Sequence, residues 1–313
     1  MLITKANLDA LRTTFSLAFQ QAYDTTEPWA PKIATEVPSS SKSNTYGWLA
    51  LQVGLREWVG PRVALNLAEH RAELINKSYE GTIEVDRDDI EDDNLGIYQA
   101  MLVPQLGQAT KKHADQLIKA LLQSNTGAGP TMYDGKALFA DDHPDYSAAG
   151  TTYDNNFGLA LTADNFNTVW SAMASYIGEN GQPLGVMPNT LVVAPQLKKA
   201  ALQIMQSSTY AVPVTNIAGS ENIGSAAIDN VLKGWAEVVV LPELANDPTT
   251  WYLADTTKPI KPLINQVRRA PSFVSRVNPD DPKVFDSKKF TYGVEYRCAV
   301  GASLPFLIAR SKP

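Results

Sequence analysis

A strictly alternating run near the end of the chain constrains the fold most. Over residues 290–300, every second residue is apolar or aromatic, and Thr, Gly, Glu, Arg and Ala stand between them. Successive side chains on a strand point to opposite faces of its sheet, so this pattern predicts a long strand with one buried face. Cys298 lies on that face, which indicates a small core residue rather than a nucleophile.

The composition indicates a globular protein. The 313 residues are 44% hydrophobic and 19% charged, enough for one large domain or two medium ones. The formal net charge of -6 does not suit a basic nucleic-acid binder. A single cysteine excludes an intrachain disulfide and suits a reducing cytosol. No signal-peptide core and no run of roughly 18 apolar residues is present, so we expect a soluble protein without a membrane partner.

The beginning of the chain predicts a helix followed by an extended arm. Residues 7–23 carry apolar side chains at helical spacing: Leu8, Leu11, Phe15, Phe19 and Ala22. The segment 25–43 contains Pro28, Pro31 and Pro38. Because prolines at this density disfavour helix and central strand, this segment is predicted to be an extended arm or linker.

Residues 46–85 predict a long hairpin. Apolar and other residues alternate from Leu49 to Leu55, a Gly60-Pro61 turn follows, and a second strand-like run comes next. An isolated two-stranded hairpin is marginal in water, and this one exposes too much apolar surface, so it has to pack against something. The predicted tip carries Arg56, Glu57, Trp58, Val59 and Arg62.

A long helix is predicted over residues 95–124, which would span about 45 Å at roughly 1.5 Å per residue. Pro104 should kink this helix or mark its true start, because proline lacks a backbone donor. We interpret His113 as a hydrogen-bonded core histidine rather than a catalytic residue. The apolar face is predicted to consist of Leu106, Ala109, His113, Leu117 and Leu121.

An acidic cluster at residues 86–93 precedes this helix. It could bind calcium, but it lacks the glycine and the terminal glutamate of the known calcium-binding loop. Acidic side chains also favour the positive end of a helix. We therefore interpret the cluster as the start of the helix that follows.

The remainder of the chain alternates helices and short strands, which predicts an α+β fold. A helix is expected over residues 163–177, capped by Thr162 or Asp164. Residues 191–194 and 238–241 are predicted to be strands, and Pro195 should open another helix. The stretch 207–226, rich in Ser, Gly, Asn and Thr, is predicted to be a long surface loop.

Searches for catalytic, cofactor and metal motifs fail. The spacing of Gly129 and Gly135-Lys136 is wrong for a phosphate-binding P-loop, and Ala137 stands where Ser or Thr is needed. The dinucleotide-binding glycine pattern and the nucleophile elbow are missing too. No two histidines stand at metal-ligand spacing, and residues 141–145 are interpreted as an Asp-rich turn before Pro144. We predict no catalytic, cofactor-binding or metal-binding residues and no enzyme, with a hydrolase whose site is dispersed in sequence left as an alternative.

Three stretches carry a family resemblance. They are residues 56–60, REWVG, residues 76–98, NKSYEGTIEVDRDDIEDDNLGIY, and residues 133–144, where YDGKALF is followed by DHP. Their order and rough spacing resemble those of the Mu-like major head subunits, the gpT family. The resemblance covers about residues 46–146.

The resemblance implies the α+β fold of the Hong Kong 97 phage capsid protein. Residues 1–45 would form an N-terminal helix and arm, 46–85 the E-loop hairpin, 86–185 a peripheral domain with a spine helix, 186–284 an axial domain, and 285–313 strands returning to the peripheral domain. The Hong Kong phage protein has an N-terminal scaffolding region. In this chain the predicted E-loop begins by residue 46, which leaves too few residues before it for such a region, so a separate scaffold or protease is expected. No crosslinking pair can be matched.

The resemblance also implies a function. The chain would self-assemble into hexamers and pentamers of an icosahedral virion head, in the cytoplasm of a bacterial host, and enclose double-stranded DNA without sequence recognition. Portal and decoration proteins would be further partners, and a tail or baseplate protein is the alternative. The hairpin would contact the neighbouring subunit, although Trp58 could instead pack inside its own subunit. The predicted interface residues are Trp48, Arg56, Glu57, Trp58 and Arg62.

Overall fold

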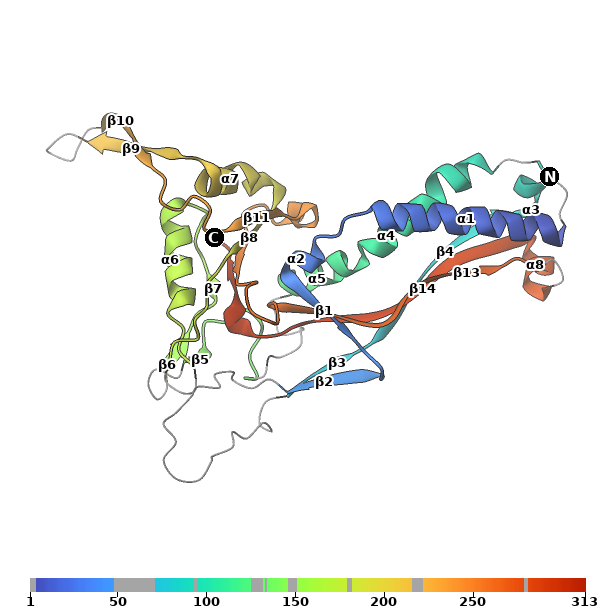
Figure 1. The fold of residues 1–313 in the computed structure, drawn as a ribbon, viewed down its shortest axis with the longest axis horizontal. Helices are drawn as coiled ribbons and strands as arrows, with labels where there is room; N and C mark the ends of the chain where they lie inside the picture. The colour runs from blue at the N-terminus through green and yellow to red at the C-terminus, as the bar shows by residue number, and fades with distance from the viewer. Residues whose placement is uncertain are drawn as a thin grey trace, which may run out of the picture.

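A long sheet runs through the elongated molecule in the computed structural model, which describes residues 4–47, 71–92, 95–124, 132, 134–145, 151–178, 182–215, 222–278 and 281–313. Four strands pair in the order β1-β13-β14-β4. β14 pairs antiparallel with β13 and β4, and β1 runs parallel to β13 at the sheet edge (Figure 1). The strands are β1 (Ala34–Pro38), β4 (Lys77–Asp86), β13 (Leu263–Arg276) and β14 (Lys289–Ala302).

β14 confirms the strand predicted from the alternating run. Phe290, Tyr292 and Cys298 on its apolar face are buried. β1 ends at Pro38 and lies at the edge of the sheet, where proline is tolerated because its missing N–H faces away from the ladder. The proline-rich arm is therefore partly structured, with a short helix α2 (Ala30–Ile33) before β1.

Helix α1 (Lys5–Thr25) covers one face of the long sheet beside α4 (Figure 1). All five apolar residues of the predicted stripe are buried, and the Thr4 side chain caps the helix by accepting from the Asn7 backbone N–H. α1 lies very close to α4, because a Cβ atom at Gly107 would be 2.6 Å from the Phe19 carbonyl oxygen. Only glycine fits at that contact.

The helix predicted over residues 95–124 is divided into three pieces. A π-helical turn η1 (Tyr98–Leu102) leads into α4 (Val103–Lys111), and α5 (His113–Gln123) follows after a break at Lys112. Pro104 lies in the first turn of α4. Of the two predicted outcomes, a kink or a helix start, the second is therefore the one observed. Proline has no backbone N–H to donate, which explains why the turn before it has the wider hydrogen-bond pattern of a π-helix.

The predicted apolar face of this helix was only partly right, because Leu121 is buried but the other four residues are not. Ala109 is exposed, and Leu106, His113 and Leu117 are only half-buried. The prediction followed the large apolar residues and missed Gly107, which the close approach of α1 buries. The buried residues of α4 and α5 include Val103, Gly107, Thr110, Ala114, Ile118 and Leu121.

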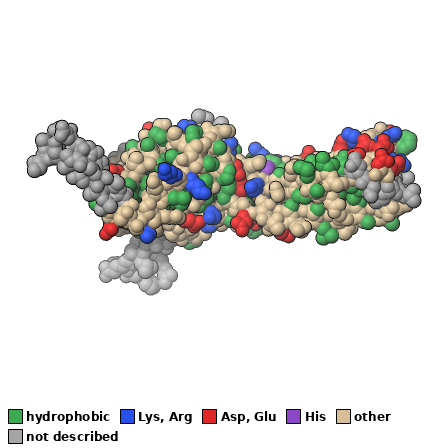
Figure 2. All heavy atoms as spheres, turned by 90° about the horizontal axis from the view of Figure 1, so that it is seen from above, with side chains coloured by type: hydrophobic (Ala, Val, Ile, Leu, Met, Phe, Trp, Pro, Cys, Tyr) green, Lys and Arg blue, Asp and Glu red, His purple; other side chains and the backbone are tan. Residues whose placement is uncertain are grey.

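The acidic cluster does stabilise the start of a helix, although a different one. Asp86 caps the short helix α3 (Arg87–Glu91), since its carboxylate accepts from the Asp88 backbone N–H at 3.1 Å. Asp88 and Asp89 lie in the first turn, where negative charge is favoured. Figure 2 shows acidic side chains gathered at the end of the molecule where Figure 1 places α3.

A second sheet forms the other half of the molecule. Its five strands have the order β11-β8-β12-β15-β7. The structure confirms the predicted kinds of element in this half. A helix capped by Thr162 lies within 163–177, strands lie at 191–194 and 238–241, and Pro195 opens a helical turn. The elements are β7 (Asn156–Phe157), α6 (Ala163–Ala174), β8 (Thr190–Val193), η2 (Pro195–Leu197), α7 (Lys198–Gln206), β11 (Glu237–Val240), η3 (Pro242–Asn246), β12 (Trp251–Ala254), η4 (Pro305–Leu307) and β15 (Ile308–Ser311).

The surface loop predicted over residues 207–226 was wrong. β9 (Thr209–Thr215) pairs antiparallel with β10 (Asn222–Asp229) in a two-stranded hairpin that projects from the second half (Figure 1). The Gly, Ser and Asn residues that suggested a loop are flanked by β-branched and small apolar residues, which is a hairpin pattern. Three further elements are β5 (His143–Asp145), β6 (Thr151–Tyr153) and α8 (Pro282–Ser287).

The hairpin predicted at 46–85 has its base in the structure. β2 (Ser43–Gly47) pairs antiparallel with β3 (Arg71–Ile75), and the chain then enters β4 of the long sheet. The second hairpin strand is therefore shorter than predicted, because residues 77–86 pair with β14 instead. The predicted interface residues Trp48, Arg56, Glu57, Trp58 and Arg62 lie outside the described residues.

A shared core joins the two halves. Ile33 of α2 and Ile118 of α5 pack in one cluster with Val192 and Tyr252 of the second sheet. The division into five segments remains a prediction, although β13, assigned to the axial segment, shares a sheet with β4 and β14. Among the helices in the described ranges, none combines the length and the apolar character that a bilayer crossing requires.

Candidate functional site

The root of the β2–β3 hairpin is held to the long sheet by neutral side chains. The Tyr46 hydroxyl donates to Gln266 Oε1 at 2.7 Å, and Gln266 Nε2 donates to Asn76 Oδ1 at 2.8 Å. Asn76 Nδ2 in turn donates to Ser39 Oγ at 2.9 Å and to the Ser41 carbonyl at 3.0 Å. Gln266 is 0% exposed and Asn76 6% exposed, so the network is buried. It links the hairpin, the arm and β13 in one place.

Close packing fixes the same root. A Cβ atom at Gly301 of β14 would lie 2.4 Å from Leu74 Cδ2, so a larger residue there would force the Leu74 side chain of β3 to move. Leu74 is itself buried. The hairpin therefore leaves the body of the molecule from a rigid base, which is what a projecting contact element needs.

The arm is attached to helix α5 by a buried carboxylate. Asp115 is 0% exposed and accepts from the backbone N–H groups of Ala30 at 2.8 Å and Trp29 at 3.3 Å. These N–H groups belong to the start of α2, where negative charge is favourable. The pKa of Asp115 is raised to about 6, chiefly by burial and also by the charge of Glu243, although the backbone hydrogen bonds and Lys112 oppose this shift.

The same junction reaches the second half of the molecule. Trp29 Nε1 donates to Glu243 Oε2 of η3 at 2.9 Å. The arm, the long helix and η3 therefore meet around Asp115. This contact was not predicted, because the residues that make it are far apart in sequence.

A buried histidine–aspartate pair holds the loop before β5. His143 Nδ1 lies 2.6 Å from Asp134 Oδ2, with the two side chains 0% and 2% exposed. His143 Nε2 lies 3.3 Å from the Leu138 carbonyl oxygen, so both ring nitrogens face acceptors. Burial alone would raise the pKa of Asp134, but the hydrogen bonds from His143 and the Lys136 amide lower it below its usual value.

This pair corrects the interpretation of residues 141–145 as a simple Asp-rich turn. His143 begins β5 and is a buried partner of Asp134. Within the described ranges, no cluster of His, Cys, Asp and Glu could hold a metal ion. The contact between Asp134 and His143 joins the two ends of this loop.

His113 is not the hydrogen-bonded core histidine that was expected. Its ring makes an edge contact with Tyr79, with centroids 4.2 Å apart, and its buried Nε2 has no hydrogen-bond partner among the described residues. Partial burial lowers its pKa. The interpretation of Cys298 is confirmed, because the thiol is 0% exposed and burial raises its pKa to about 11. A thiol that stays protonated is a poor nucleophile.

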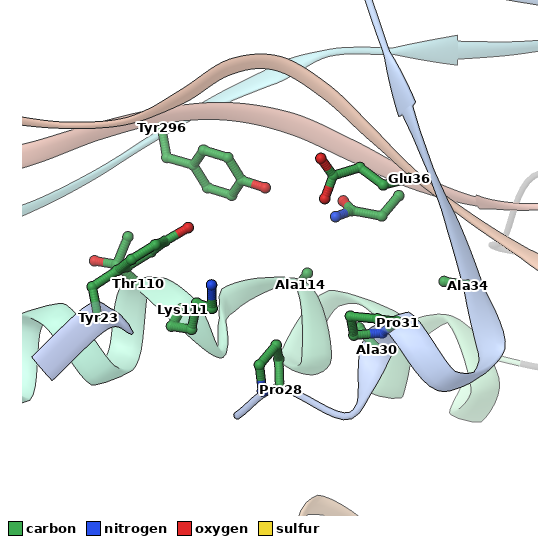
Figure 3. A pocket seen from close by; sticks show the side chains of 11 residues that line it. Tyr23, Pro28, Ala30, Pro31, Ala34, Glu36, Thr110, Lys111, Ala114 and Tyr296 are labelled. Atoms are coloured by element: carbon green, nitrogen blue, oxygen red, sulfur yellow. The ribbon is translucent and has the colours of Figure 1, made fainter. Parts of the chain in front are cut away.

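A polar cavity of about 160 Å³ lies between the end of α1, the arm, α4, α5 and the edge of the long sheet. Figure 3 shows Tyr23, Lys111, Glu36 and Tyr296 pointing into it from four different elements. Asn265 of β13 also lines it. Sequence reasoning missed this cavity, because its residues come from the beginning, middle and end of the chain.

The fold is similar to those of solved phage shells. The structure of the bacteriophage JBD30 procapsid matches 99% of this chain and 76% of its own chain, with 31% identity and a TM-score of 0.61. A JBD30 capsid decorated with minor capsid protein trimers matches 78% of this chain and 99% of its own, with 27% identity and a TM-score of 0.52. With its long helix, long sheet and rooted hairpin, the chain has the α+β fold of Hong Kong 97-like phage capsid proteins.

Sequence comparison narrows this class. The major capsid protein of Escherichia phage Mu is 30% identical over 301 residues, which is 96% of this chain and 72% of the Mu protein. The chain belongs to the family of the Mu-like prophage major head subunit gpT, whose model matches residues 8–159, 153–244 and 234–313. It is a major head subunit of the virion and not an enzyme. The family thus decides against both alternatives, a tail or baseplate protein and a hydrolase.

Proposed function

We propose that this subunit assembles into hexamers and pentamers of an icosahedral head that encloses double-stranded DNA, and that assembly takes place in the cytoplasm of the bacterial host. The observation that best supports this is the rooted hairpin. The β2–β3 pair has a rigid, buried base on the long sheet, and residues 48–70 are the segment of the chain that connects its two strands. Negative-stain microscopy of the purified chain tests the proposal. We expect closed shells or ring-shaped capsomers, and tubes or small discrete particles would contradict it.

We further propose that the hairpin tip binds a neighbouring subunit through Trp48, Arg56, Glu57, Trp58 and Arg62. Aromatic and arginine side chains are the usual energetic anchors of protein interfaces. Trp58→Ala should leave the unassembled subunit folded and block shell formation, at a cost of roughly 2–4 kcal/mol per contact. A lower melting temperature of the unassembled mutant would instead mean that Trp58 packs within its own subunit. Normal stability together with normal shells would contradict both readings.

The role of a head subunit also implies binding partners, which we propose here. By analogy with the decorated JBD30 capsid, we propose that minor capsid proteins bind the outside of the shell. A portal protein and a separate scaffold or protease are further proposed partners.

We propose that contact with packaged DNA is by confinement and not by sequence recognition. The formal net charge of -6 supports this, since strong binding to duplex DNA needs many basic contacts to phosphates. A filter-binding measurement on the unassembled subunit should give weak affinity. A sub-micromolar affinity at physiological salt would contradict the proposal.

A further inference from the structure

The polar cavity beside β1 contains a buried amide with an unused acceptor, although its side chain also bonds Tyr296. Asn265 is 8% exposed, and its Oδ1 is enclosed without a partner in the part of the chain that the structure describes. A buried carbonyl oxygen without a donor is destabilising and is rare in folded proteins. The free acceptor can therefore take a hydrogen bond from a donor group that enters the cavity.

A carboxylate stands next to this acceptor. The parallel pairing of β1 with β13 places Glu36 directly beside Asn265. Glu36 is exposed, so the cavity is open to the surface on this side, and no ion pair of Glu36 is found among the described residues. In Figure 3 its carboxylate points toward the Tyr296 hydroxyl, inside the cavity. Two acceptors, one of them charged, thus face the same space.

Two aromatic rings complete the lining. Tyr23 and Tyr296 both line the cavity, and Lys111 Nζ already lies over the Tyr23 ring, 4.3 Å from its centroid. A cation is therefore tolerated here. Burial raises the pKa of Tyr23, and the charges of Glu36 and Asp24 raise it further. The two carboxylates near this hydroxyl thus favour positive charge in the cavity.

We propose that this cavity binds the guanidinium or ammonium group of a basic side chain from another protein chain. A guanidinium suits it best, because its planar fork of N–H donors can reach a carboxylate and an amide oxygen together and can stack on a tyrosine ring. Lys111 is then a competitor within the subunit. The chemistry of the site is a property of the single subunit, and only the source of the side chain rests on the proposed function.

Titration of the unassembled subunit with Nα-acetyl-arginine amide tests the site. We expect saturable binding, followed by NMR shifts of the Asn265 amide, and no binding of the uncharged citrulline analogue. Glu36→Gln should weaken binding about tenfold, because it removes a charge-assisted hydrogen bond. Glu27→Gln is the matched control, since it makes the same charge change in the same arm outside the cavity lining, and it should have no effect. Lys111→Met should strengthen binding by freeing the Tyr23 ring.

Equal binding of the arginine and citrulline compounds, or equal effects of the two glutamate substitutions, would overturn the proposal. Maps of assembled shells then identify the source. A basic side chain in the cavity of shells grown from this chain alone would come from a second copy, and one found only in complete heads would come from another head protein. Solvent alone in both would also overturn the proposal. If neither shells nor ring-shaped capsomers form, the proposed function fails, while the titration still tests the site.

Discussion

The hairpin root and the arm junction each hold an extended segment to the body of the subunit, but they do so with different chemistry. At the hairpin root, the neutral side chains of Tyr46, Gln266 and Asn76 form a closed, buried network. At the arm junction, the buried carboxylate of Asp115 holds two backbone N–H groups. A neutral network has no proton to gain or lose near neutral pH, whereas a desolvated carboxylate with a pKa raised to about 6 does. The hairpin is thus rooted independently of pH, and the arm is not.

Removing the carboxylate should have the largest effect. Asp115→Ala leaves the N–H groups of Trp29 and Ala30 buried without an acceptor, and we expect a loss of about 3 kcal/mol in the free energy of unfolding of the unassembled subunit. Chemical denaturation measures this. Asp115→Asn keeps one acceptor oxygen and should lose less. A loss below about 1 kcal/mol for the alanine variant would mean that the arm is held mainly by its apolar contacts.

Breaking the neutral network should cost somewhat less. Gln266→Leu fills a similar volume but removes the acceptor of the Tyr46 hydroxyl and the donor to the Asn76 amide oxygen, so we expect a loss of about 2 kcal/mol in the free energy of unfolding. Gln105→Leu makes the same chemical change at an exposed position of α4 and serves as the control. Equal losses for the two variants would show that the network does not hold the root.

The arm junction and the hairpin root should differ most clearly in how their stability depends on pH. The pKa of Asp115 is raised in the folded state, so its stabilising contribution is complete below its unfolded pKa and is lost as pH rises through about 6. Between pH 7 and pH 5, attachment of the arm should strengthen by about 1 kcal/mol. Hydrogen exchange of the Ala30 amide, compared between the native chain and Asp115→Asn, measures this. Protection of the β2–β3 amides should stay constant, and a parallel change there would contradict the comparison.

Substitution of His113 should have the smallest effect on the free energy of unfolding. Its buried Nε2 is unbonded among the described residues, and its ring already contacts Tyr79 and Tyr296. Because no hydrogen bond is lost, His113→Phe should change the free energy of unfolding by less than about 0.5 kcal/mol. Thermal unfolding of the two proteins at the same pH measures the difference. A strong destabilisation would mean that the imidazole has a partner in solution.

Local patterns in the sequence predicted the elements whose signal is local. The stripe on α1 and the alternation in β14 depend only on neighbouring positions, and Pro104 marked the start of α4 for the same reason. The face of α4 was mistaken, because Gly107 is buried by the approach of α1, which no spacing within the helix reveals.

The anchoring sites could not be predicted, because their partners are far apart in the chain. Asp115 and Ala30 are 85 positions apart, and Gln266 and Asn76 are 190 apart. Pairing of Asp134 with His143 spans only nine positions, yet it depends on how a loop closes. A local pattern carries no information about such pairs. The family resemblance supplied the hairpin's role, and the interface residues at its tip remain a prediction.

We propose that a hairpin with a rigid root joins each subunit to its neighbour in the shell. A cryo-EM map of shells assembled from this chain tests this proposal. We expect Trp58 to lie against the neighbouring subunit's long helix and sheet, with β2, β3 and the Gln266 network unchanged from the single subunit. A map in which Trp58 packs only against its own subunit would contradict the claim.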